Sequence, residues 1–141
     1  MGYVIVCGSK SAGAAVRSML RTETVETPAA KIYSENAVVI LGKDGCAEIE
    51  RAFSVIINGD EPPYPVPCGV QVITIGQSPK NTVSVTSRTP ELLTLSLNRA
   101  VNTLKGTVEP LELPLRVPET TDEIGCMAAF AAGILLGEIG E

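Results

Sequence analysis

The stretch Val4–Leu20, VIVCGSKSAGAAVRSML, decides how the rest of the chain is interpreted. A short β-branched run, Tyr3–Cys7, ends at Gly8, and Ala12–Arg21 follows with apolar side chains at helical spacing. This pattern predicts a buried strand, a glycine-containing loop and a helix, the arrangement with which nucleotide-binding domains hold phosphate. The stretch therefore poses one question, which is whether the loop still binds phosphate or is the remnant of a loop that did.

The composition is that of one aliphatic domain. The 141 residues fit a single domain over 1–141, and a 45% hydrophobic content with 4% aromatic residues and no tryptophan favours a layered α/β core. A formal net charge of −5 argues against nucleic acid as a partner. The most apolar run, Met127–Leu136, is about half as long as a membrane-spanning helix requires, and no signal peptide is visible. We therefore expect a cytoplasmic protein that has no membrane partner.

The cysteine and histidine contents limit the chemistry. The chain has four cysteines without a CxxC pair, and it has no histidine. Without histidine, one chain cannot form a Ser-His-Asp or Cys-His nucleophilic site, so we name no catalytic residue. We also expect no metal site, and we expect the cysteines to be buried thiols in a reducing cytoplasm, namely Cys7, Cys46, Cys68 and Cys126.

The first half of the chain is predicted to form a parallel sheet. Buried strands are expected at Val38–Leu41, Ser54–Asn58 and Val70–Ile75, each a short run rich in β-branched residues. The polar segment Thr22–Asn36 is predicted to be a loop. A short helix is predicted to start near Asp44 and to end before the second of these strands.

The second half changes to an alternating pattern. From Thr82 onward apolar and polar residues alternate, which predicts antiparallel strands laid against the parallel core. Residues 91–104 fit either a strand or a helix, and we favour a strand over Leu92–Asn98. A last helix is predicted from a cap at Thr121 to Gly137. The predicted fold class is α/β, with a Rossmann-like or P-loop-like parallel sheet and helices, extended by antiparallel strands in the C-terminal half.

Three segments of the second half carry a family resemblance: VIINGDEP at 55–62, VITIGQSPKNTVSVTS at 72–87 and LPLRVPETTDEIGCMAAFAAGILLGE at 113–138. In this order they resemble the later part of the central domain of the Mur ligases and their folylpolyglutamate synthetase relatives. The likeness covers about residues 55–137, and it implies an α/β sheet domain with helices on its faces.

The resemblance also implies ATP-dependent amide formation, with phosphates held in a Gly-Thr-x-Gly-Lys-Thr-Thr loop. Against that loop Gly8 matches the first glycine and Ser9 the threonine, but Ala12 stands at the lysine position. Lys10 comes two residues too early, and Gly125 replaces the asparagine that ends a later family motif. Since alanine can neither stabilise a transferring phosphate nor hold magnesium, the loop is interpreted as degenerate.

We therefore expect a non-catalytic Mur-ligase-like domain without a cofactor that acts as a binding, regulatory or self-associating module. The alternative is a small ATP- or nucleotide-dependent ligase-like enzyme or subunit that uses magnesium. Anion or nucleotide binding would involve Gly8, Ser9, Lys10, Ser11 and Gly13. A second candidate ligand site is formed by Asn58, Asp60 and Glu61, because ligands bind at the carboxyl ends of strands in open α/β sheets.

The C-terminal half also predicts an assembly. Its alternating strands, Leu93–Leu97 and Leu111–Leu115, offer more apolar positions than a monomer of this size needs. We expect a homodimer, or pairing with another subunit, through this half of the chain.

Overall fold

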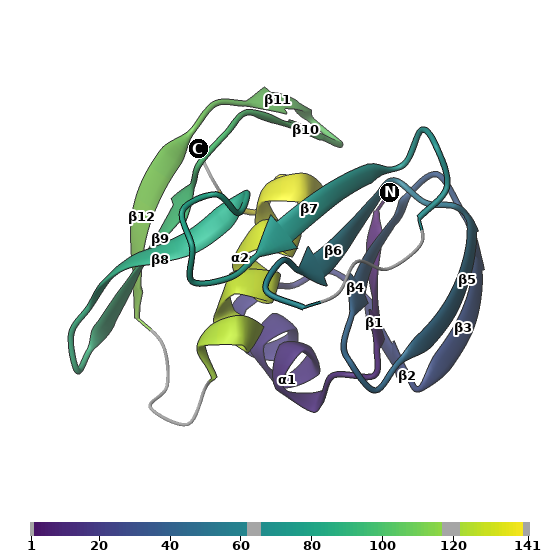
Figure 1. Ribbon diagram of the computed structural model, residues 1–141, viewed down its shortest axis with the longest axis horizontal. Coiled ribbons are helices and arrows are strands. Elements are labelled where there is room, and N and C mark those ends of the chain that lie inside the picture. Colours follow the sequence, from purple (N-terminus) through teal and green to yellow (C-terminus); the bar gives the residue numbers. More distant parts are fainter. Residues whose placement is uncertain (1, 62–65, 117–121, 140–141) are drawn as a thin grey trace.

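An eight-stranded sheet lies at the centre of the computed structural model, which describes residues 2–61, 66–116 and 122–139 (Figure 1). The strand order is β12-β9-β8-β7-β6-β4-β1-β2. The parallel strands are β2 (Thr24–Thr27), β1 (Tyr3–Cys7), β4 (Ala37–Leu41), β6 (Ser54–Asn58) and β7 (Gln71–Ile75). The continuous apolar sequences of β4 and of most of β6 fit strands that are buried on both faces.

An antiparallel extension continues the sheet beyond β7. It consists of β8 (Val83–Arg88), β9 (Leu92–Leu97) and β12 (Leu111–Arg116), and β9 runs antiparallel to both of its neighbours. A single parallel pair, Ile75 with Val83, joins the extension to β7. The predicted α/β class, with a mostly parallel sheet and added antiparallel strands, is therefore confirmed at this level, and so is the strand favoured within 91–104.

Two helices cover one face of the sheet, α1 (Lys10–Met19) and α2 (Glu123–Leu136) (Figure 1). Every residue of α2 from Gly125 to Leu136 is buried, because it lies between α1 and the sheet. The helices touch at Gly125, where an added Cβ would lie 2.7 Å from the carbonyl oxygen of Ser11. The helix ends at Gly137 with φ 80°, as predicted, and its N-cap is Asp122; the predicted cap, Thr121, is outside the described residues.

A two-stranded parallel ribbon covers part of the opposite face (Figure 1). It pairs β3 (Ala29–Tyr33) with β5 (Cys46–Arg51) and closes a second apolar cluster over β1 and β4. The predicted loop over 22–36 is therefore wrong, since that segment holds β2 and β3. The short helix predicted after Asp44 is also wrong, because Ala47 and Ile49 alternate with exposed glutamates as one face of a strand packed on the sheet.

A small hairpin packs against the end of α2. The hairpin pairs β10 (Val101–Thr103) with β11 (Gly106–Val108), and the Leu104 amide after β10 donates to the Leu135 carbonyl of α2 at 2.9 Å.

Cys7 and Cys126 are buried, but Cys46 and Cys68 are exposed, so the expectation of four buried thiols is wrong for two of them. Neither α1 nor α2, the helices of the described ranges, has the length and apolarity needed to cross a membrane.

Candidate functional site

A cavity of ≈ 680 Å³ opens at the carboxyl edge of the parallel strands. Its floor is apolar, because it is made of side chains that the sheet and α2 direct between the two layers: Val6, Ile40, Ile56, Ile75, Ile124 and Ala128. Its rim is polar and is formed by the loops that follow the strands and by the first residues of both helices. An apolar floor with a few polar groups at the mouth is typical of small-molecule sites.

The cavity lies where the topology of the sheet reverses. The chain leaves β1 toward β2 on one side, and the later strands β4, β6 and β7 are added on the other side. The cavity is lined by Gly8–Ala12, which follow β1, and by Gly42–Asp44, which follow β4. In open α/β sheets this switch point is the place where ligands bind.

Three glycines allow the two loops at this point to touch. A Cβ on Gly8, whose φ is 76°, would lie 2.0 Å from the Gly45 nitrogen, and one on Gly45 would lie 2.2 Å from the Cys7 oxygen. A Cβ on Gly42 would lie 2.4 Å from the Gly8 oxygen, and the Gly42 amide donates to the Cys7 carbonyl at 2.8 Å. These glycines therefore join the loop after β1 to the loop after β4 by backbone contact.

The connection from β1 to α1 is only two residues long, Gly8 and Ser9. Ser9 is the N-cap, since its hydroxyl accepts from the Ala12 amide at 3.2 Å, and its carbonyl accepts from the Gly13 amide at 3.1 Å. The amides of Lys10 and Ser11 are the other first-turn donors, and both residues line the cavity. The first turn carries no acidic side chain, so the partial positive charge of the helix N-terminus faces the rim.

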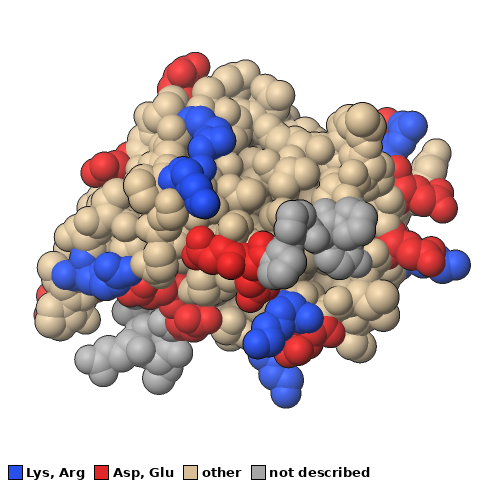
Figure 2. Space-filling model, viewed as in Figure 1, with Lys and Arg blue, Asp and Glu red and all other residues tan. Residues whose placement is uncertain are grey.

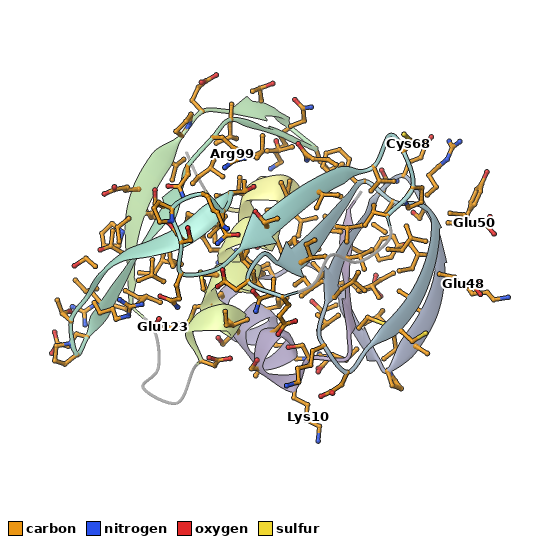
Figure 3. The ribbon with its side chains drawn as sticks, in the orientation of Figure 1. Lys10, Glu48, Glu50, Cys68, Arg99 and Glu123 are labelled. Atoms are coloured by element: carbon orange, nitrogen blue, oxygen red, sulfur yellow. The ribbon has the colours of Figure 1, made fainter. Side chains whose placement is uncertain are left out.

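The rim mixes charges of both signs. Lys10 and Lys43 stand against the carboxylates of Asp44, Glu61 and Asp122. The Glu26 carboxylate, also at the rim, accepts from Arg17 Nε at 2.6 Å. Figure 2 shows acidic and basic side chains interspersed on the lower part of this face, and Figure 3 shows Lys10 extending away from the sheet. The rim can therefore contact ligand groups of either charge, and charges of both signs are mixed along it.

The two candidate sites of the sequence partly merge. Gly8, Ser9, Lys10 and Ser11 line the same cavity as Asn58 and Glu61. Gly13 is not among the residues that line it; it is buried in α1, where an added Cβ would lie 2.2 Å from Glu26 Oε1.

Asp60 is also separate from the cavity lining. Its carboxylate accepts from the Gln77 amide at 3.2 Å, and its own amide donates to Asn58 Oδ1 at 2.9 Å. Asp60 therefore fastens the end of β6 to the end of β7.

Sequence reasoning missed four charged rim residues, Lys43, Asp44, Glu26 and Asp122. The first two directly follow the predicted strand Val38–Leu41, and residues after parallel strands gather at one edge of the sheet. The same rule that selected Asn58 could therefore have selected them.

Beside the rim, a polar cluster fixes the start of α2. Arg88 at the end of β8 donates through Nη2 to Glu123 Oε1 at 2.8 Å, and Gln77 Nε2 donates to the same carboxylate at 3.2 Å. The hydrogen bond from Arg88 lowers the pKa of Glu123 below its ordinary value. Figure 3 labels Glu123 at the first turn of α2, so this cluster ties the antiparallel extension to the helix that carries Asp122.

Among the described residues no group of histidine, cysteine, aspartate or glutamate side chains is arranged to hold a metal ion. The lining residues of the rim carry hydrogen-bonding groups and single charges. Comparison of the chain with models of known protein families, with curated proteins and with solved structures finds no match.

Proposed function

We propose that this chain is a non-catalytic, Mur-ligase-like domain that binds a small molecule in the cavity between β1 and β4. The observation that carries the proposal is the position of this apolar-floored cavity at the switch point of the sheet. A ligand with an apolar body and polar ends would match the floor and the rim. Binding without turnover would make the domain a sensor or a regulatory module.

The loop geometry supports the absence of catalysis. A working phosphate loop wraps backbone amides around the phosphates and adds a lysine and a hydroxyl that holds magnesium. Here the connection from β1 to α1 is two residues long, and the Ala12 amide already donates a hydrogen bond to the Ser9 hydroxyl. Ala12, at the position of the family's lysine, is buried and cannot supply charge.

The alternative, an ATP- or nucleotide-dependent ligase-like enzyme, has one observation in its favour. The amides of Lys10 and Ser11 and the side chain of Lys43 stand at one rim, where a phosphate group would find donors and positive charge. Hydrolysis of ATP by the purified chain, with magnesium present, would favour this alternative over the binding module.

Self-association through the C-terminal half stays a prediction, but most of the leucines expected to mediate it are covered by the protein's own core. Leu93, Leu95 and Leu97 are buried in the main core, and the alternate leucines of β12 pack against the same core. A charged residue at Leu95 would therefore test folding rather than association.

The binding module is tested by a thermal-shift screen of small molecules, with ATP and magnesium included, on matched variants. Ser11→Trp places a large side chain at the rim, and Ser18→Trp places the same side chain on the exposed part of α1. A ligand that raises the melting temperature of the native chain and of Ser18→Trp, but not of Ser11→Trp, supports the proposal. A shift that persists in Ser11→Trp places binding elsewhere and contradicts it.

A further inference from the structure

The two edges of the eight-stranded sheet differ in whether they can accept another strand. Edge strand β12 exposes Glu112, Pro114 and Arg116, and charged side chains and proline are the usual means of protecting an edge. The other edge strand, β2, has the sequence TVET; it has no proline, and its one charged side chain, Glu26, pairs with Arg17 of the same chain. Its Val25 is 46% exposed, one of the few large apolar side chains on the described surface. Thus β2 is the less protected of the two edges.

The backbone groups that β2 turns outward can be identified from its bonds to β1. The Val4 amide donates to the Glu23 carbonyl at 3.0 Å, and the Gly8 amide donates to the Thr27 carbonyl at 3.0 Å. The backbone groups of successive residues in a strand point in alternate directions. The amide and carbonyl of Val25 therefore also face β1, while those of Thr24 and Glu26 point away from the sheet. Within the described ranges, β2 pairs with β1 alone.

We propose that a second copy of this chain adds its own β2 to this edge. The two β2 strands run antiparallel and are related by a two-fold axis that passes between their Val25 residues. In this register Thr24 lies opposite Glu26 of the second copy, and the two residues exchange both backbone hydrogen bonds. The axis repeats this pair on its other side. The two Val25 side chains meet in the intervening non-hydrogen-bonded pair, where side chains lie closest, so the sheet becomes continuous through both copies.

The neighbouring registers are disfavoured by groups already present. An axis through Glu26 would place the two Glu26 carboxylates opposite each other. An axis through Thr24 would need the Thr22 amide, which already donates to Glu138 Oε2 at 3.0 Å. With the axis at Val25 the ladder ends at Pro28, which has no amide to offer. With the axis at Val25, Glu26 keeps its ion pair with Arg17 and lies opposite Thr24 of the second copy rather than opposite another carboxylate.

The register is tested by disulfide cross-linking in a Cys46→Ser, Cys68→Ser background, which removes the exposed native thiols. Cα atoms of a non-hydrogen-bonded antiparallel pair are about 4.5 Å apart, within the range that a disulfide needs. Val25→Cys should therefore form a covalent dimer under mild oxidation. Thr24→Cys is the control, since its counterpart is displaced by two residues, about 6.7 Å along the strands. With the spacing between the strands added, the two Cα atoms lie beyond the limit of about 7 Å for a disulfide. Absence of a cross-link at Val25→Cys, or equal cross-linking of both variants, overturns the proposal.

The association itself is tested by sedimentation of the native chain and two charged variants. Val25→Lys places two ammonium groups at the axis, whereas Val72→Lys changes a side chain of similar exposure, 39%, on the interior strand β7. The native chain and Val72→Lys should sediment as dimers at tens of micromolar, and Val25→Lys should show a dissociation constant raised about tenfold or more, since each tenfold step needs only 1.4 kcal/mol. A monomeric native chain, or a Val25→Lys dimer of unchanged affinity, refutes the model. If Val25→Lys does not fold by circular dichroism, the cross-linking pair decides.

Discussion

Replacing Gly8 by alanine tests whether this glycine is present for the contact between the loops that follow β1 and β4. The new Cβ would lie 2.0 Å from the backbone nitrogen of Gly45, and the residue would keep a φ of 76° that side chains disfavour. The positive φ costs about 1–2 kcal/mol. The forced shift of the Gly45 backbone costs a further 1–3 kcal/mol, by the usual range for overpacking.

Gly69→Ala is the matched control. Gly69 also has a positive φ, 90°, but apart from its chain neighbours none of the described residues comes within 4 Å of an added Cβ. Both substitutions restrict the unfolded chain equally, so the difference between them isolates the contact with Gly45. We expect Gly8→Ala to lower the free energy of unfolding by about 1–3 kcal/mol more than Gly69→Ala does.

Urea unfolding followed by circular dichroism measures this difference, since the chain has no tryptophan to report by fluorescence. Equal losses in the two variants would refute the reasoning, because they would show that the two loops are free to separate. A smaller loss in Gly8→Ala than in Gly69→Ala would refute it more strongly.

Two further predictions concern thiols and acid. In native protein Cys46 and Cys68 should react rapidly with a maleimide, while Cys7 and Cys126 should react only after denaturation, since burial raises the pKa of Cys126 to about 11; fast labelling of a third thiol would contradict this. Because the pKa of Glu123 is lowered by Arg88, its stabilising effect is present above the ordinary value of 4.5 and is lost as the pH falls through the lower folded value. The stability difference between the native chain and Glu123→Gln, below about 1 kcal/mol for so exposed a pair, should shrink as the pH falls below 4.5. A difference independent of pH would exclude this role.

The strands of the main sheet could be predicted from sequence because they are short and strongly apolar. Tyr3–Cys7, Val38–Leu41 and Ser54–Asn58 are bounded by glycine or polar residues, as buried parallel strands are. The segment Thr24–Tyr33 was missed because β2 is an exposed edge and β3 has one face in water, so neither forms an apolar run. For Cys46–Arg51 the period-two signal of Ala47 and Ile49 was present but too short to outweigh a helix start at Asp44.

The candidate site was predictable in position more than in detail. The rule that residues after parallel strands meet at one edge brought Ser9 and Asn58 to the same cavity. The cap formed by Ser9 and the separate role of Asp60 depend on side-chain hydrogen bonds. Such bonds are set by the exact approach of two loops, which no local pattern specifies.

The central claim, a binding module without catalysis, is tested most directly by amide NMR spectra of the ¹⁵N-labelled chain during a titration with small molecules. The small molecules should include ATP with magnesium. For that sample, phosphorus NMR spectra recorded in parallel show whether ATP is hydrolysed. We expect binding compounds to shift the amides of Gly8–Ser11 and Gly42–Asp44, which line the cavity, while ATP stays unhydrolysed. Shifts confined to residues outside this cavity, or the appearance of ADP, would contradict the account.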